Sequence, residues 1–133
     1  MDDNMRTGIA FAESHVLILL ASSGMMLLAA ARDLMIVFLG IELMSISVYA
    51  LAGMNRRSIR SAEGALKYFL LGAFSTAFLL YGIALVYGAT GTTNLPMIAG
   101  RITIYSLSGS PLLVTGIAML LIGFAGIPCN SPQ

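Results

Sequence analysis

The chain has 133 residues and a formal net charge of +1, with 58% hydrophobic and only 10% charged residues. A soluble domain keeps roughly a quarter of its residues charged, so this composition excludes an ordinary water-exposed domain and indicates a chain whose solvent is lipid. No basic stripe or charged tail is present for nucleic acid. With one cysteine, Cys129, one histidine, His15, and no glycine-rich nucleotide motif, the sequence predicts no metal, cofactor or redox site, so any redox chemistry is expected in partners.

Long apolar runs predict an all-α, polytopic membrane protein with about four transmembrane helices, each near the ~20 residues that a membrane-crossing helix needs. In chain order, the predicted spans are residues 9–31, 34–53, 62–87 and 111–127, and together they form a single transmembrane helical domain over residues 1–133. The polar stretch 88–110 is predicted as a loop. The third span also carries small residues at helical spacing, Gly72 with Thr76 and Ala73 with Ala77, where another helix could approach closely.

The charges between the spans predict an orientation. Three arginines, Arg56, Arg57 and Arg60, lie in the connection between the second and third spans, whereas the opposite side offers only Arg32 and Arg101. By the positive-inside rule, the N-terminus and the loop 54–61 are therefore cytoplasmic. Together with the resemblance described below, this predicts a multi-pass protein of the bacterial inner (cytoplasmic) membrane.

Glu42 is the most informative residue, because it lies near the middle of the second span within an otherwise apolar run. At ~1.5 Å of rise per residue, it is roughly 16 Å from the cytoplasmic end of that span, which is too far for a glutamate to reach the interface. A carboxyl group there must be protonated, paired or in contact with water. Glu42 is therefore the main candidate for a proton-loading group, with simple interhelical hydrogen bonding as the structural alternative.

Lys67 lies just inside the third span and has two open explanations. Its long side chain could reach the cytoplasmic interface, or pair with Glu63 one helical turn earlier. It could equally face inward and act on Glu42 or another buried acid. His15 is expected at the membrane interface, and the hydroxyl groups of the spans are expected mostly to bond to their own helices.

Four stretches of the sequence resemble a known family. They are RDLMIVFLGIELMS (32–45), AGMNRRS (52–58), EGALKYFLLGA (63–73) and LYGIALVYGATG (80–91). Together they resemble the antiporter-like membrane subunits of bacterial proton-translocating NADH-quinone oxidoreductase (respiratory complex I), and among them subunit N. The resemblance covers roughly residues 22–124.

The resemblance implies a proton relay in which Glu42 and Lys67 belong to a buried chain of acids and lysines, in translocation coupled to quinone reduction elsewhere. It implies other membrane subunits and the lipid bilayer as partners, with the NADH, flavin, iron–sulfur and quinone sites in those partners. Two departures exist. Family members have further helices before the first span, and they continue after a stretch like Gly123-Phe124-Ala125 with a phenylalanine–lysine pair, where this chain has Gly126 and Ile127. The chain is therefore expected to be a fragment, a partial antiporter-like bundle from a truncated or frame-shifted gene, and inactive alone.

Three alternatives remain open. The chain could be a subunit of a multi-subunit cation/proton antiporter, which shares the same helix plan. It could be a small stand-alone proton-coupled transporter whose helices dimerise around Glu42. It could also be a membrane scaffold without transport activity.

Overall fold

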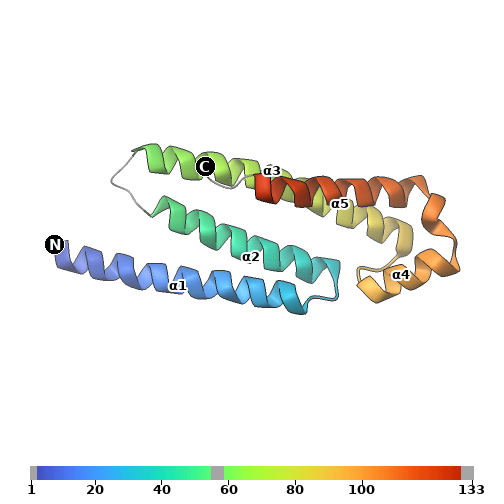
Figure 1. Cartoon of the computed structure of the whole chain (residues 1–133), viewed down its shortest axis with the longest axis horizontal. Coiled ribbons are helices and arrows are strands. Elements are labelled where there is room, and N and C mark those ends of the chain that lie inside the picture. The colour runs from blue at the N-terminus through green and yellow to red at the C-terminus, as the bar shows by residue number, and fades with distance from the viewer. Residues whose placement is uncertain (1–2, 55–58, 130–133) are drawn as a thin grey trace.

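The computed structural model describes residues 3–54 and 59–129. Within these ranges the chain is helical, and Figure 1 shows four long helices lying side by side along one axis, with a short helix at one end. The all-α, polytopic fold predicted from the apolar runs is confirmed. The elements, in chain order, are α1 (Asp3–Ala30), α2 (Leu34–Gly53), α3 (Ile59–Thr90), α4 (Leu95–Ile104), the 3-10 turn η1 (Leu107–Gly109) and α5 (Pro111–Cys129).

Three of these helices are long and apolar enough to cross a membrane, judged by length and composition: Thr7–Ala30, Leu34–Gly53 and Ala62–Thr90. The apolar part of α5, Pro111–Gly126, is shorter. Large apolar side chains point outward along the helices; Phe74 is 70% exposed and Met26 is 72% exposed. Such surfaces are expected to meet lipid or other membrane helices, since water would not solvate them.

The stretch 88–110, predicted as a loop, is corrected by the structure, because it contains α4 and η1. Asn94 caps α4: its side-chain oxygen accepts a hydrogen bond from the Met97 N–H at 3.2 Å, and a proline follows in the first turn. Both features favour a helix start, since Asn satisfies an open N–H and Pro has none to satisfy. At the other end, Arg101 donates a side-chain hydrogen bond to the Thr90 carbonyl oxygen at the end of α3.

Helices α1 and α2 pack through two glycines. A Cβ atom on Gly24 would lie 2.8 Å from the Met44 nitrogen, and one on Gly40 would lie 3.1 Å from the Gly24 carbonyl oxygen. No side chain fits there, so the two backbones are in direct contact. In lipid, such close approach replaces the hydrophobic effect as the source of helix association.

Helices α3 and α5 pack in the same manner. A Cβ atom on Gly82 would lie 2.7 Å from the Leu120 nitrogen, and one on Gly123 would lie 2.8 Å from the Leu79 nitrogen. The small residues singled out in the sequence play a different part: Gly72 receives the ring of Tyr49 from α2, while Ala73 and Ala77 are exposed. A core cluster of buried apolar residues joins α2, α3, α4 and α5; it consists of Leu34, Ile41, Leu79, Ile83, Val86, Ile98 and Leu113.

The turn between α1 and α2 is tied to the turn between α3 and α4. Asp33 caps α2: its Oδ1 atom accepts a hydrogen bond from the Met35 N–H at 2.8 Å. Its Oδ2 atom accepts a hydrogen bond from the Thr93 hydroxyl at 2.9 Å. Two backbone bonds accompany it, from the Leu34 N–H to the Thr93 carbonyl at 2.9 Å and from the Leu95 N–H to the Arg32 carbonyl at 2.8 Å. The polar pair Arg32 and Asp33 therefore links the two turns at one end of the bundle.

Candidate functional site

The candidate site centres on Glu42, near the middle of α2. The residue as a whole is partly buried, but its Oε1 atom is buried and has no hydrogen-bond partner in the part of the chain that the structure describes. Buried polar atoms nearly always have a partner, so an orphan carboxylate oxygen requires a functional or chemical explanation. A carboxyl group in an apolar membrane helix is costly without a polar partner, so Glu42 is expected to meet water or a polar group from beyond the described residues.

Helix α2 holds Glu42 on the side away from α1. The contacts with α1 are made by Gly40, Leu43 and Met44. Glu42 is two residues from Gly40, which places it roughly 200° around the helix from that contact. Tyr49, seven residues after Glu42 and so on the same stripe of α2, contacts Gly72 of α3, which places Glu42 on the α3 side of α2. Figure 1 shows α2 between α1 and α3.

Two further hydroxyl residues lie on this side of α2. Ser45 and Tyr49 follow Glu42 at i+3 and i+7, a spacing that places all three on one helical stripe. The Tyr49 ring packs against Gly72 of α3 and meets the Phe69 ring edge to face, with 6.3 Å between the ring centroids. We name this set, Glu42, Ser45 and Tyr49, the hydroxyl stripe. This set was not predicted from the sequence, although the i, i+3, i+7 spacing of its members indicates one face of a helix.

Lys67 lies on α3 and is exposed. The α2-facing side of α3 is marked by Ala65, opposite Gly53, and by Gly72, under Tyr49. Lys67 is two residues past Ala65 and therefore points roughly 200° away from that side. The structure thus places Glu42 and Lys67 on surfaces that do not face each other, and Lys67 makes no ion pair with Glu63 within residues 59–129.

In the part of the chain that the structure describes, the remaining ligating residues form no second cluster. His15 is exposed, its Nδ1 atom lies 2.7 Å from the Phe11 carbonyl oxygen, and its ring lies against the Phe11 ring. Among residues 3–54 and 59–129, no group of three or more His, Cys, Asp and Glu side chains could hold a metal ion. Arg56 and Arg57, on which the predicted orientation rests, lie outside the described residues.

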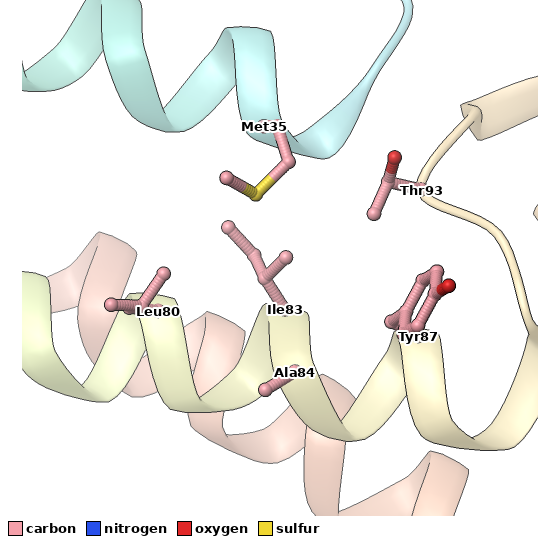
Figure 2. A pocket seen from close by; sticks show the side chains of 6 residues that line it. All are labelled: Met35, Leu80, Ile83, Ala84, Tyr87 and Thr93. Atoms are coloured by element: carbon pink, nitrogen blue, oxygen red, sulfur yellow. The ribbon is translucent and has the colours of Figure 1, made fainter.

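A pocket of about 280 Å³ lies elsewhere, near the N-terminus of α2. In Figure 2, Met35 of α2 faces Ile83 of α3 across the space, and Thr93 and Tyr87 lie at one side. The lining is completed by Leu80 and Ala84. This pocket is apolar and open, and it is separated from Glu42 by about two turns of α2, so it contributes no group to the candidate site.

An apolar helix bundle with one orphan carboxyl group in a membrane-spanning helix is typical of ion-coupled transport proteins. Comparison with known families agrees: residues 31–128 match the transmembrane family described as NADH:quinone oxidoreductase/Mrp antiporter, TM. This match covers well over half of the chain, and the chain belongs to that family.

Particular relatives are bacterial and archaeal. The chain is 57% identical over 127 residues to NADH-quinone oxidoreductase subunit N of Gemmatimonas aurantiaca, covering 92% of this chain and 24% of the relative. It is 45% identical over 112 residues to F(420)H(2) dehydrogenase subunit N of Methanosarcina mazei, covering 84% of this chain and 22% of the relative.

Among solved structures, a chain of respiratory complex I from Thermus thermophilus with bound aureothin is similar, with a TM-score of 0.68 and 40% identity, over 85% of this chain and 24% of that chain. The chain thus spans about a quarter of the length of the relatives that it matches. The resemblance inferred from the four sequence stretches is confirmed.

Proposed function

We propose that this chain is part of the subunit N of a membrane-bound NADH-quinone oxidoreductase, and that it contributes to proton translocation coupled to quinone reduction. The observation that carries the proposal is Glu42, whose buried Oε1 atom has no partner in the described residues and lies within a membrane-length helix. A carboxyl group in such a place can hold a proton in its neutral form and release it when water or a cation approaches.

Lys67 is proposed as a second charge of the same relay. Its side of α3 is not covered by the described helices, so a lysine there needs a further protein surface or the membrane interface to hold its charge. The face of α3 that carries Lys67 is therefore proposed to lie against another part of the full-length subunit. Polar side chains from that part of the full-length subunit would then connect Lys67 with Glu42.

The redox reaction is proposed to take place in partner subunits. The relatives' names connect this family to NADH and quinone, and flavin and iron–sulfur clusters are expected alongside them in those partners. The exposed apolar sides of α1 and α3 support the proposal that other membrane subunits and lipid cover this chain. Within the complex, the chain would belong to a translocating enzyme, while alone it would be inactive.

The proposed location is the bacterial inner membrane. In the sequence, Arg56 and Arg57 stand between the ends of α2 and α3, and Arg60 is the second residue of α3. By the positive-inside rule, this connection and the N-terminus are on the cytoplasmic side. The turn closed by Asp33 and Thr93 would then lie on the opposite side.

A second candidate is a subunit of a multi-subunit cation/proton antiporter, because the matched family includes Mrp antiporters as well as NADH:quinone oxidoreductases. The two candidates differ in the source of energy. A respiratory subunit moves protons only while NADH is oxidised, whereas an antiporter exchanges protons for another cation without a redox reaction.

The test uses the full-length subunit in the intact complex, reconstituted in vesicles, with NADH-driven proton uptake and NADH:quinone electron transfer measured together. Glu42→Gln should lower the number of protons taken up per NADH oxidised, because the amide cannot release a proton. Glu63→Gln is the matched control, since Glu63 is exposed in the first turns of α3. Unchanged proton uptake in Glu42→Gln would contradict the proposal, and cation-driven proton exchange without NADH would favour the antiporter.

A further inference from the structure

Among the residues whose side chains the structure describes, the serine and threonine hydroxyl groups of the long helices share a common pattern, from which Ser45 departs. Serine and threonine side chains in α1, α2, α3 and α5 donate to the carbonyl oxygen four residues earlier, as Ser47 does to Leu43 at 2.7 Å and Thr76 does to Gly72 at 2.9 Å. This is the ordinary way in which a membrane helix satisfies a hydroxyl group. Ser45 is different: in the described part of the chain its hydroxyl has no hydrogen bond.

Ser45 lies next to another orphan group. Glu42, three residues earlier on the same stripe, has the buried Oε1 atom without a partner among the described residues. The Tyr49 hydroxyl, four residues after Ser45, likewise has no hydrogen bond in the described part of the chain. One stripe of a membrane helix thus carries three oxygen-bearing side chains without hydrogen-bond partners among the described residues. Water commonly satisfies such groups.

The spacing suits water bridges. With ~1.5 Å of rise per residue, Ser45 lies ~4.5 Å along the axis from Glu42, and Tyr49 lies ~6 Å beyond Ser45. One water molecule joins two oxygen atoms that are roughly 5.5 Å apart, because each hydrogen bond spans about 2.7–2.8 Å. One or two waters therefore suffice for each step.

The neighbouring helix makes room for the last member of the stripe. A Cβ atom at Gly72 would collide with the hydroxyl and ring of Tyr49. Glycine at this position lets the phenol lie directly on the backbone of α3, while the ring edge rests on Phe69. The phenol is thus held in place by packing, and no described group forms a hydrogen bond with its hydroxyl.

We propose that Ser45 and Tyr49, with intervening water, carry protons between Glu42 and the C-terminal end of α2. This inference rests on the proposed function and adds the path for one half of the membrane. In each transfer the Glu42 carboxyl group gives its proton to a water molecule and becomes a carboxylate. Each hydroxyl group accepts a proton on a lone pair from one side and gives up its own proton on the other, so Ser45 and Tyr49 end each transfer neutral.

The test compares variants of the full-length subunit in the intact complex. Tyr49→Phe keeps the ring and its contacts but removes the hydroxyl group. Proton uptake should be about tenfold slower, which is below the ~10²–10⁴-fold contribution of a positioned acid–base group because water can partly replace the phenol. Ser45→Ala should slow uptake in the same direction, and Ser45→Thr should restore it. Ser47→Ala is the matched control, because Ser47 bonds only to its own helix.

The solvent deuterium isotope effect separates proton transfer from structural damage. If the relay is correct, the isotope effect on proton uptake rises in Tyr49→Phe and Ser45→Ala, since proton transfer then limits the rate. The proposal is overturned if Tyr49→Phe translocates at the unaltered rate, or is slowed no more than Ser47→Ala with an unchanged isotope effect. If Glu42→Gln abolishes translocation while Tyr49→Phe leaves it intact, the relay fails and the proposed function stands. If Glu42→Gln has no effect, the proposed function itself fails, and the relay with it.

Discussion

Substitution of Gly82 by alanine tests whether α3 and α5 are held together by backbone contact. A Cβ atom at this position would lie 2.7 Å from the Leu120 nitrogen and 2.8 Å from the Gly116 carbonyl oxygen. Favourable contacts of carbon atoms lie near ~3.5 Å, so the two helices would have to separate locally by roughly 0.8 Å. Both obstacles are backbone atoms, which cannot rotate away as a side chain can.

Two opposing terms set the size of the effect. Overpacking in a well-packed interior costs ~1–3 kcal/mol, while replacing glycine with alanine in a helix returns up to ~1 kcal/mol. With the full helix gain subtracted, the net loss expected for Gly82→Ala is about 0–2 kcal/mol, toward the upper end because both obstacles are backbone atoms. Gly64→Ala is the matched control, because Gly64 lies on the same helix and a Cβ there would meet nothing within 4 Å; it should be neutral or stabilising.

The assay is detergent-driven unfolding of the full-length subunit, followed by circular dichroism during titration with sodium dodecyl sulfate. Gly82→Ala should unfold at a lower fraction of the denaturing detergent than the unsubstituted protein, and Gly64→Ala should not. The reasoning is refuted if Gly82→Ala is as stable as Gly64→Ala, because the close contact of α3 with α5 would then contribute nothing to stability.

Three further results are expected. Asp33→Ala should destabilise the subunit by about 1 kcal/mol through loss of the α2 cap, and by a further ~1 kcal/mol through loss of the hydrogen bond from Thr93. Thr93→Val should show only the second loss in the same unfolding titration. Equal stability of both variants and the unsubstituted protein would contradict a stabilising link between the two turns. Lys67→Gln should lower proton uptake per NADH while leaving the amount of assembled complex unaltered, and Lys67→Arg should retain more activity because it keeps the charge; a purely interfacial lysine would tolerate both changes. The 133-residue chain, purified alone into vesicles, should show no proton flux above that of empty vesicles under an imposed pH gradient, and robust flux would instead support the small-transporter alternative.

Much of the fold could be predicted from the sequence because a membrane imposes a simple rule. Apolar runs of about 20 residues must become helices, since lipid offers no partner to an open backbone. That rule found α1, α2 and α3, and an acid in the middle of such a run, Glu42, stood out for the same reason. It missed α4, which is short and begins in a stretch rich in threonine and glycine. Its cap, Asn94 followed by Pro96, was a readable start signal.

The pairing of the helices could not be predicted from the sequence. Fourteen glycines are spread over the chain, and the ones that matter differ from the rest only by what lies across from them. Gly64 faces open space, whereas Gly82 touches backbone. The direction of Lys67 was undetermined for a related reason, because the face of α3 that meets α2 is defined by Tyr49 resting on Gly72, a contact between distant parts of the chain.

This packing also decides where the proposed proton relay would lie. The close contact of Gly40 with Gly24 fixes one side of α2 against α1, and a helix fixed on one side has its opposite side fixed as well. Glu42, Ser45 and Tyr49 all lie on that opposite side, where α3 contributes a glycine rather than a side chain opposite Tyr49. A larger residue at position 24 or 40 would turn or displace α2 and move all three oxygen-bearing groups together. The glycine contact between α1 and α2 is therefore what aligns the hydroxyl stripe with α3, although none of its residues exchanges a proton.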